Sequence, residues 1–225
     1  MKLVIAAVAD IHCPKYFDLF KNALKEIPTP DLFLLVGDTV LKNDYTQLSD
    51  VISAIRNCYE NKIIACFGNE EYEDSLMEYK KFEEITWLSD ESTVLDIKGK
   101  NLGIVGSRGS LDRPTFWQRT RVRGIGQVYK HRIEVINSLL ADLTANLKIV
   151  ISHYAPTYRT LVGEREFLWP EMASKQLESV IEAMQPDLWL HGHIHRGTVP
   201  KIELGNTIIM NVSLPSTKKI TIIEL

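Results

Sequence analysis

The chain has 225 residues, 45% of them hydrophobic and 24% charged, and its formal net charge at pH 7 is −3. This composition is typical of a soluble globular protein, and we expect residues 1–225 to form a single domain around one large core. The negative net charge argues against broad electrostatic binding to nucleic acid or anionic lipid, although it is compatible with a local basic patch.

Short apolar runs alternate with segments of helical periodicity in the first part of the chain. The runs at 3–10, 31–38 and 62–69 have the length of buried strands, and apolar residues at helical spacing follow each of them. This alternation predicts a βαβαβα order, with right-handed crossovers and a largely parallel sheet. Two further runs, TVLDIKG and NLGIVGS, predict a β-hairpin with Gly99 and Lys100 near its turn.

The second part of the chain begins with a basic segment. We expect a loop up to about Ile125, and the apolar spacing over 128–143 predicts a helix. Buried strands are predicted at 147–153 and 187–193, separated by a loop and by a helix around 177–184. The remaining residues alternate strand and turn signals, so they predict a meander that belongs to a second sheet.

Residues suited to metal binding follow five of the predicted strands. The segments are Asp10-Ile11-His12, Gly37-Asp38, Gly68-Asn69, His153 and Gly192-His193-Ile194-His195. The carboxyl ends of parallel strands face one crevice in an open α/β sheet, so we expect these distant side chains to converge. The glycines allow sharp turns beside an ion. The spacing of two places Asp10 with His12, and His193 with His195, on one side of an extended segment.

The chemistry of this set favours a pair of cations. It contains two carboxylates, one amide oxygen and four imidazoles, without thiolates, and such ligands suit Mn²⁺, Fe, Zn²⁺ or Mg²⁺. Seven ligands exceed the needs of one structural ion but suffice for two ions that share a bridging carboxylate, as in phosphoryl transfer. Each element also has a simpler reading: Asp-x-His occurs by chance in many chains, and His153 could hydrogen-bond a backbone group. The interpretation therefore depends on the joint occurrence of all five elements.

The order DxH, GD, GN, a lone His and GHxH resembles the signature of the calcineurin-like metallophosphoesterases, and the match extends from Asp10 to His195. The resemblance implies a four-layer αββα sandwich, an α/β fold with two mixed β-sheets between helices. It also implies which residues hold each metal: Asp10, His12 and His195 the first, Asn69, His153 and His193 the second, and Asp38 both. Mn²⁺ is the favoured ion, with Fe, Zn²⁺, Ni²⁺ and Mg²⁺ as alternatives.

The expected activity follows from charge. Two divalent ions less two aspartates leave a formal charge of about +2, which attracts a phosphate ester and lowers the pKa of a shared water. We therefore expect a hydrolase that cleaves a phosphodiester or nucleotide-type substrate by in-line attack of a metal-bridging hydroxide.

Glu70 stands where the family normally has a histidine after GN. Two roles are open for it. It could act as a general acid if burial and Glu71 raise its pKa, or it could pair with an arginine and take no part in catalysis. His191 is a further candidate in the catalytic group, where it would pack against or support the ligands.

The stretch 107–132 holds seven arginines and lysines against one acid, with three aromatic residues interleaved. Such a stretch could hold a nucleotide or a short single strand, or it could be a solvated loop that pairs with acids elsewhere. Arg108 is the candidate for a direct catalytic or substrate contact, because it follows an apolar run. The candidate substrate-binding residues are Asn69, Arg108, Arg113, Tyr154 and Arg159, the last two on the loop after His153.

Two other functions are open. A nuclease acting on single-stranded nucleic acid is disfavoured by the net charge, and an interaction module that kept the fold but lost catalysis is disfavoured by the retention of all seven ligands. We expect a small phosphoester or nucleotide as the partner and leave the oligomeric state open. Three cysteines without a disulfide or metal pattern, and no apolar run of roughly 18 residues, indicate a cytoplasmic protein without a membrane partner.

Overall fold

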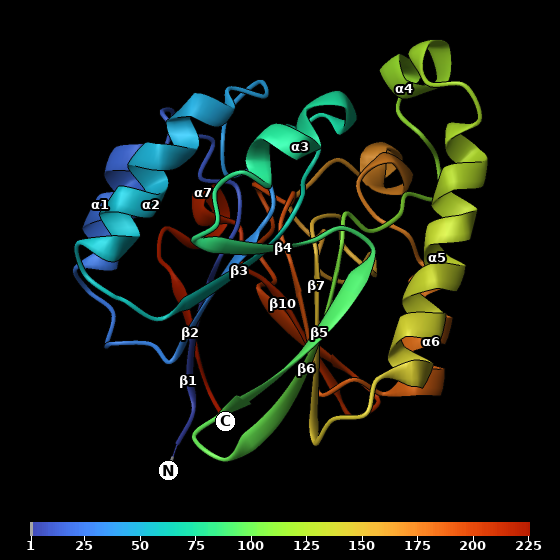
Figure 1. The fold of residues 1–225 in the computed structure, drawn as a ribbon. Helices are drawn as coiled ribbons and strands as arrows, with labels where there is room; N and C mark the ends of the chain where they lie inside the picture. The colour runs from blue at the N-terminus through green and yellow to red at the C-terminus, as the bar shows by residue number, and fades with distance from the viewer. Residues whose placement is uncertain (1) are drawn as a thin grey trace.

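The computed structural model describes residues 2–225 as two β-sheets packed face to face, with helices on both outer sides (Figure 1). The strand order is β11-β1-β2-β3-β4 in the five-stranded sheet and β5-β6-β7-β8-β10-β9 in the six-stranded sheet. This arrangement confirms the predicted α/β sandwich with two mixed sheets.

The first sheet contains four parallel strands and one antiparallel strand. The parallel strands are β1 (Val4–Val8), β2 (Leu32–Val36), β3 (Lys62–Cys66) and β4 (Ile85–Leu88), and β11 (Thr221–Glu224) runs antiparallel to β1. The connections carry α1 (Phe17–Leu24), η1 (Tyr45–Gln47), α2 (Leu48–Arg56), η2 (Glu73–Ser75) and α3 (Leu76–Tyr79). All five residues of β2 are buried, as expected for a strand covered on both faces. The predicted βαβαβα order is confirmed.

The second sheet has a parallel centre and antiparallel edges. Its strands are β5 (Glu91–Ile97), β6 (Lys100–Ser107), β7 (Leu147–Ser152), β8 (Leu188–His191), β9 (Lys201–Leu204) and β10 (Thr207–Asn211). Strands β5 and β6 form the predicted hairpin, and its turn places Lys98 and Gly99 at φ of 55° and 75°. Before and after β7 lie α5 (Ile125–Asp142), η3 (Glu166–Glu171) and α6 (Gln176–Met184).

Three apolar clusters hold the layers together. On the outer side of the first sheet, Phe20 of α1 and Val51 of α2 belong to one buried cluster. On the outer side of the second sheet, Ile136 of α5 packs in a cluster with Trp189 of β8. Between the sheets, Leu34 and other β1–β3 side chains share a cluster with side chains of β6, β7 and β8. Each fully buried side chain of this size contributes roughly 1.5–3 kcal/mol to folding.

Three details differ from the sequence predictions. The four-residue strand β4 was not predicted. The basic segment before Ile125 is not only a loop, because it contains α4 (Phe116–Arg121), which starts with a capping box between Thr115 and Gln118. The C-terminal strands do not form one meander: β9 and β10 pair in the second sheet, α7 (Leu214–Thr217) follows, and β11 joins the first sheet beside β1.

Across residues 2–225, none of the helices combines the length and the apolarity that crossing a bilayer requires.

Candidate metal centre

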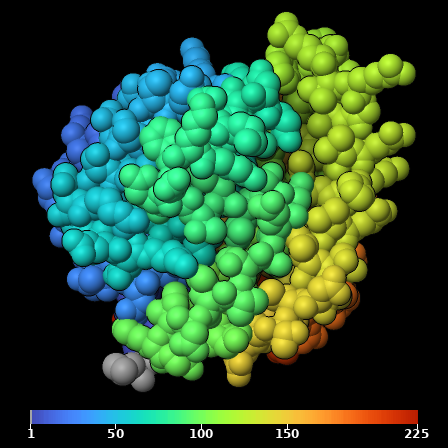
Figure 2. Space-filling view, viewed as in Figure 1, coloured from blue at the N-terminus to red at the C-terminus, as the bar shows by residue number. Residues whose placement is uncertain are grey.

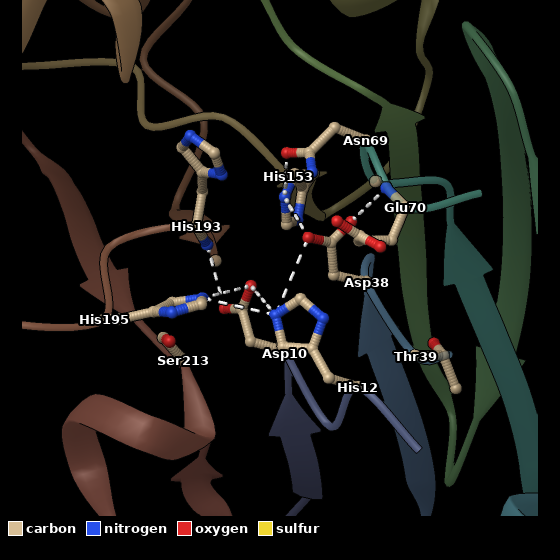
Figure 3. A network of polar contacts seen from close by, with 12 residues as sticks. Asp10, His12, Asp38, Thr39, Asn69, Glu70, His153, His193, His195 and Ser213 are labelled. Carbon is tan, nitrogen blue, oxygen red and sulfur yellow. Dashed lines mark hydrogen bonds and ion pairs between the residues drawn. The ribbon is translucent and has the colours of Figure 1, made fainter. Parts of the chain in front are cut away.

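The predicted metal ligands meet where strands of both sheets end (Figure 3). Asp10, Asp38 and Asn69 follow β1, β2 and β3 of the first sheet, and His153 directly follows β7 of the second. His193 and His195 lie in the turn after β8. The facing edges of the two sheets therefore bring together side chains that are far apart in the sequence, as predicted.

The first group of ligand atoms comes from Asp10, His12 and His195, which all lie within 4.8 Å of one another. The Nε2 atom of His195 lies 3.1 Å from Oδ1 of Asp10, and Nε2 of His12 lies 3.7 Å from the same oxygen. The two Nε2 atoms are 3.4 Å apart. Three ligand atoms thus face one point.

The second group consists of Asp38, His153 and His193, again within 4.8 Å of one another. Nε2 of His153 lies 3.3 Å from Oδ2 of Asp38 and 3.1 Å from Oδ1 of Asn69, so the asparagine adjoins this group. Oδ2 of Asp38 also lies 3.8 Å from Nε2 of His12 in the first group. Asp38 therefore stands between the two groups, which is the place that a bridging ligand would take.

Backbone groups orient the ligand side chains. One oxygen of each aspartate accepts a backbone hydrogen bond: Oδ2 of Asp10 accepts from the His193 N–H at 2.9 Å, and Oδ1 of Asp38 accepts from the Glu70 N–H at 2.8 Å. The Nδ1 atom of His153 lies 3.2 Å from the Val36 carbonyl oxygen, so it can donate a proton there and leave Nε2 free to bind a cation.

This donor set fits divalent cations. The converging atoms are carboxylate oxygens, imidazole nitrogens and an amide oxygen, which are the ligand types that Mn²⁺, Zn²⁺ and Fe prefer. The structure therefore contains two groups of side chains that are each able to hold a cation.

The charges of the site support the same interpretation. Burial opposes ionisation of Asp10, but its hydrogen bond with His195 and the nearby His153 hold its pKa well below the usual range. Burial opposes protonation of His153, but the Asp38 carboxylate raises its pKa to about 9. His193 is different, because burial and repulsion by His153 lower its pKa to about 3. A cation that binds His153 must displace a proton, so its affinity should increase with pH.

The backbone of the ligand loops is strained. Asp10, His12, Asp38 and His193 have positive φ angles of 59°, 42°, 51° and 69°. Non-glycine residues rarely adopt this conformation, and such strain is typical of sites that the surrounding fold over-determines. The prediction that Asp10 and His12, and likewise His193 and His195, lie on one side of an extended segment is therefore wrong. Left-handed turns aim these side chains instead, and His193 and His195 enter different groups.

The predicted glycines serve two purposes. Gly37 adopts a φ of 80° at the sharp turn before Asp38, as expected. Gly68 is required for a different reason, because a side-chain carbon there would lie 2.2 Å from Oδ1 of Asp38. The third strand end can approach Asp38 this closely only without a side chain.

Glu70 does not pair with an arginine. Its Oε2 accepts a hydrogen bond from the Lys42 N–H at 2.5 Å, and no arginine among residues 2–225 forms an ion pair with it. In the same segment Glu73 pairs with Arg108 instead: its Oε2 lies 2.8 Å from Nη1 of that arginine. The alternative in which Glu70 pairs with an arginine is thus wrong, and its carboxylate instead ties the loop after β3 to the loop after β2.

Glu71 holds the ligand loops from within the protein, which the sequence interpretation missed. It is fully buried, and its carboxylate accepts hydrogen bonds from the N–H groups of Asp38, Thr39 and Gly68 at 2.9, 2.7 and 2.6 Å. Burial and the neighbouring Asp38 raise the pKa of Glu71 to about 7, although the hydrogen bonds from these N–H groups act to lower it. The only feature of the sequence that pointed to this role of Glu71 was its position as a second acid next to Glu70.

Arg108 and His191 lie in supporting positions. Besides Glu73, Arg108 donates from Nη2 to the Glu71 carbonyl oxygen at 2.7 Å, so it anchors the loop after β3. His191 is buried between the Thr160 hydroxyl, 3.0 Å from Nε2, and the Gly192 carbonyl oxygen, 2.9 Å from Nδ1. Burial lowers its pKa to about 4, and it belongs to neither ligand group.

The remaining substrate candidates lie at different distances from the ligands. The buried ring of Tyr154 lies 5.0 Å from the ring of His193, measured between centroids, so it adjoins the second group. Arg113 donates to Glu171 at 3.0 Å and to the Phe167 carbonyl oxygen at 2.6 Å. Arg159 is half-exposed and lies 3.8 Å from Glu178. Both arginines are thus engaged outside the ligand groups.

Comparison with known proteins agrees with this geometry. A sequence model described as calcineurin-like phosphoesterase matches residues 3–197. No curated protein matches the chain.

Solved structures share the fold at low sequence identity. The phosphopantetheinyl hydrolase PptH from Mycobacterium tuberculosis is 13% identical with a TM-score of 0.68, covering 96% of this chain and 90% of its own. The protein TT1561 of Thermus thermophilus is 15% identical with a TM-score of 0.62, covering 99% and 98%. A dimetal phosphatase from Danio rerio is 12% identical with a TM-score of 0.61, covering 93% and 86%. With the family match extending over most of its length, the chain belongs to the calcineurin-like phosphoesterase family.

Proposed function

We propose that the protein is a phosphodiesterase that needs two divalent cations, with Mn²⁺ as the favoured ion, and that acts on a phosphodiester or nucleotide-type substrate. The observation that carries this proposal is the position of Asp38 between two groups of ligand atoms, 3.3 Å from His153 and 3.8 Å from His12. Cations bound there would supply Lewis-acid charge and an activated water.

The protein's own residues position these groups. In this proposal Asp10, His12 and His195 hold one cation, Asn69, His153 and His193 hold the other, and Asp38 contacts both. His191 and Arg108 support the loops that carry these ligands rather than touch the reacting atoms. Tyr154 packs on His193 and closes one side of the substrate site.

Glu70 is proposed to be structural. One of its oxygens is bound by the Lys42 N–H, which fixes the carboxylate on the loop after β2. The family's histidine is absent from this position, so the departing oxygen receives less help from a proton donor. Esters whose leaving groups are acidic need no such donor. The enzyme should therefore favour aryl phosphodiesters over alkyl ones.

The test is a series of phosphodiesters whose leaving groups span a wide range of pKa, assayed with Mn²⁺. We expect log(kcat/KM) to fall steeply as the leaving-group pKa rises, and Glu70→His to flatten this dependence. Glu70→Gln separates the two roles of the carboxylate: a structural residue leaves the slope unchanged, whereas a general acid makes it steeper. Equal rates for aryl and alkyl esters in the wild type would contradict the proposal.

Two further expectations belong to this proposal. Residues 1–225 would act as one domain, which the shared apolar cluster between the sheets supports. A reducing compartment such as the cytoplasm is supported by Cys13, Cys58 and Cys66, which are all free thiols.

A further inference from the structure

A basic arm projects from the body of the protein beside the metal centre. We define the arm as residues 113–124, which contain α4. In Figure 1 helix α4 stands apart from the sheets above the start of α5, and Figure 2 shows the same yellow-green segment rising from the surface with free side chains. None of the six residues of α4 is buried. The arm therefore adds nothing to the core, and its composition needs another explanation.

The arm exposes aromatic side chains. Phe116 is 73% exposed and Trp117 is 56% exposed, which is unusual for such large apolar groups. Successive residues on a helix point in directions about 100° apart, so the two rings present two separate faces. Phe167, which is 66% exposed, lies in the segment that Arg113 binds through a backbone carbonyl. The region thus offers flat apolar surfaces to the solvent.

Positively charged side chains lie close to these rings in the sequence. Residues 113–132 contain no acid, and their six cations are Arg113, Arg119, Arg121, Arg123, Lys130 and Arg132. Three of them have acidic neighbours: Arg113 and Arg119 near Glu171, and Arg132 near Asp90. The other three form no ion pair with any residue in 2–225. One of these, Arg121, lies over the Trp117 ring at 5.4 Å.

Two of the three free cations border a hollow at the base of the arm. Its volume is about 580 Å³, and Arg123 and Lys130 both line it. Asp112 also lines the hollow, and its two oxygens accept hydrogen bonds from the Ser174 and Tyr158 hydroxyls, the Lys175 N–H and the Gln176 amide. Its negative charge offsets one of the two cations, so the formal charge of the hollow is positive by one.

The arm is connected to the metal centre through two contacts. Gln118 of α4 donates from Nε2 to the Tyr154 hydroxyl at 3.4 Å, and the Tyr154 ring lies 5.0 Å from the ring of His193. The buried Tyr154 thus holds the base of the arm next to the side of the metal centre that His193 occupies.

We propose that the arm, together with Lys130 of α5, binds a short single-stranded oligonucleotide, with bases on Trp117 and Phe116 and phosphates on Arg121, Arg123 and Lys130. Unpaired bases stack on exposed aromatic rings, and arginine and lysine bind the phosphates between them. Arginines flank the adjacent rings on both sides, and the rings present two separate faces instead of one continuous apolar face, which favours such a ligand over a protein or a membrane. This inference rests on the proposed function, because it takes the phosphodiester substrate proposed above to be one that links nucleotides.

The test measures the binding of a fluorescein-labelled phosphorothioate deoxythymidine decamer to the Mn²⁺-loaded protein of residues 1–225 by anisotropy, at several salt concentrations. Trp117→Ala removes one stacking surface and should weaken binding about 5- to 100-fold. Arg121→Ala combined with Arg123→Ala removes two phosphate contacts. The slope of log Kd against log salt should then decrease by about 1.4.

A matched control replaces two exposed lysines at a distance from the arm, Lys25→Ala and Lys62→Ala, and should bind like the wild type. Equal affinity of the wild type and the arm variants would overturn the proposal, as would no binding by the wild type or an equal loss in the lysine control. A concentration-dependent dimer that dissociates in Trp117→Ala, seen by light scattering without oligonucleotide, would also overturn it, because the arm would then be a protein interface. Hydrolysis of an aryl phosphodiester is assayed separately, so a failure of catalysis and a failure of the arm are distinguishable.

Discussion

Replacement of Glu71 by glutamine tests how the two ligand loops are held together. The wild-type carboxylate accepts from the Thr39 N–H at one oxygen and from the Asp38 and Gly68 N–H groups at the other. Glutamine keeps the size of the side chain but has a single acceptor oxygen. Its NH₂ group must therefore face at least one buried N–H donor, and that donor loses its partner.

The expected cost follows from these contacts. Below the Glu71 pKa of about 7 both oxygens of the protonated carboxyl can still accept from N–H groups, whereas the NH₂ group of glutamine cannot. A buried donor without a partner costs about 1–3 kcal/mol. We therefore expect Glu71→Gln to lower the free energy of unfolding by about 1–3 kcal/mol.

The assay is urea denaturation with a chelator present, so that cation binding does not contribute. It is done at pH 6, below the Glu71 pKa of about 7, because burial and Asp38 make ionisation of this carboxyl costly in the fold, and that cost would mask the loss at higher pH. The matched control is Glu73→Gln, the same change two residues away at an exposed side chain that pairs with Arg108. A surface ion pair contributes only about 0–1 kcal/mol. If Glu71→Gln destabilised the protein no more than Glu73→Gln, the role assigned to Glu71 would be refuted.

Three further predictions concern the same fold and site. Gly68→Ala places a carbon 2.2 Å from Oδ1 of Asp38 and should weaken Mn²⁺ binding at least about tenfold by calorimetry; an unchanged Kd would exclude this role of the glycine. Asp112→Asn should cost about 1–2 kcal/mol at pH 7. Because hydrogen bonds in the fold lower the pKa of Asp112 despite burial, this stabilisation is complete above its ordinary value of 3.8 and disappears as the pH falls through the folded-state pKa. An equal effect of Asp112→Asn at pH 7 and pH 2.5 would contradict that reasoning. A chelator should lower the melting temperature of the Mn²⁺-loaded wild type by more than that of Asp10→Asn, which keeps only the second group of ligands intact, and an equal decrease in both would show that the aspartate holds no cation.

The arrangement of the ligands could be predicted from the sequence, because it depends on a local pattern. Five of the buried strands end near a residue able to bind a metal, and parallel strands bring such ends together. The backbone that aims the ligands was not predictable in the same way. Asp10 and His12 have the spacing of an extended segment, yet both adopt positive φ, because the site and not the local sequence determines their conformation.

Other features depend on contacts between distant segments. The role of Glu71 is visible only when the loop after β2 lies against the loop after β3, which places three N–H groups around one carboxylate. Strand β11 was recognised as a strand, but its pairing with β1 depends on the packing of the two sheets. Helix α4 has no buried face, so its sequence lacks the apolar periodicity by which longer helices are predicted.

We propose that seven side chains, contributed by the ends of five strands, hold two cations with Asp38 between them. The metal content of the protein after equilibrium dialysis against Mn²⁺ tests this proposal, measured by mass spectrometry with Asp38→Ala as the comparison. We expect two cations per chain in the wild type and a loss of cations in the variant. A wild-type protein that binds one cation or none would contradict the proposal.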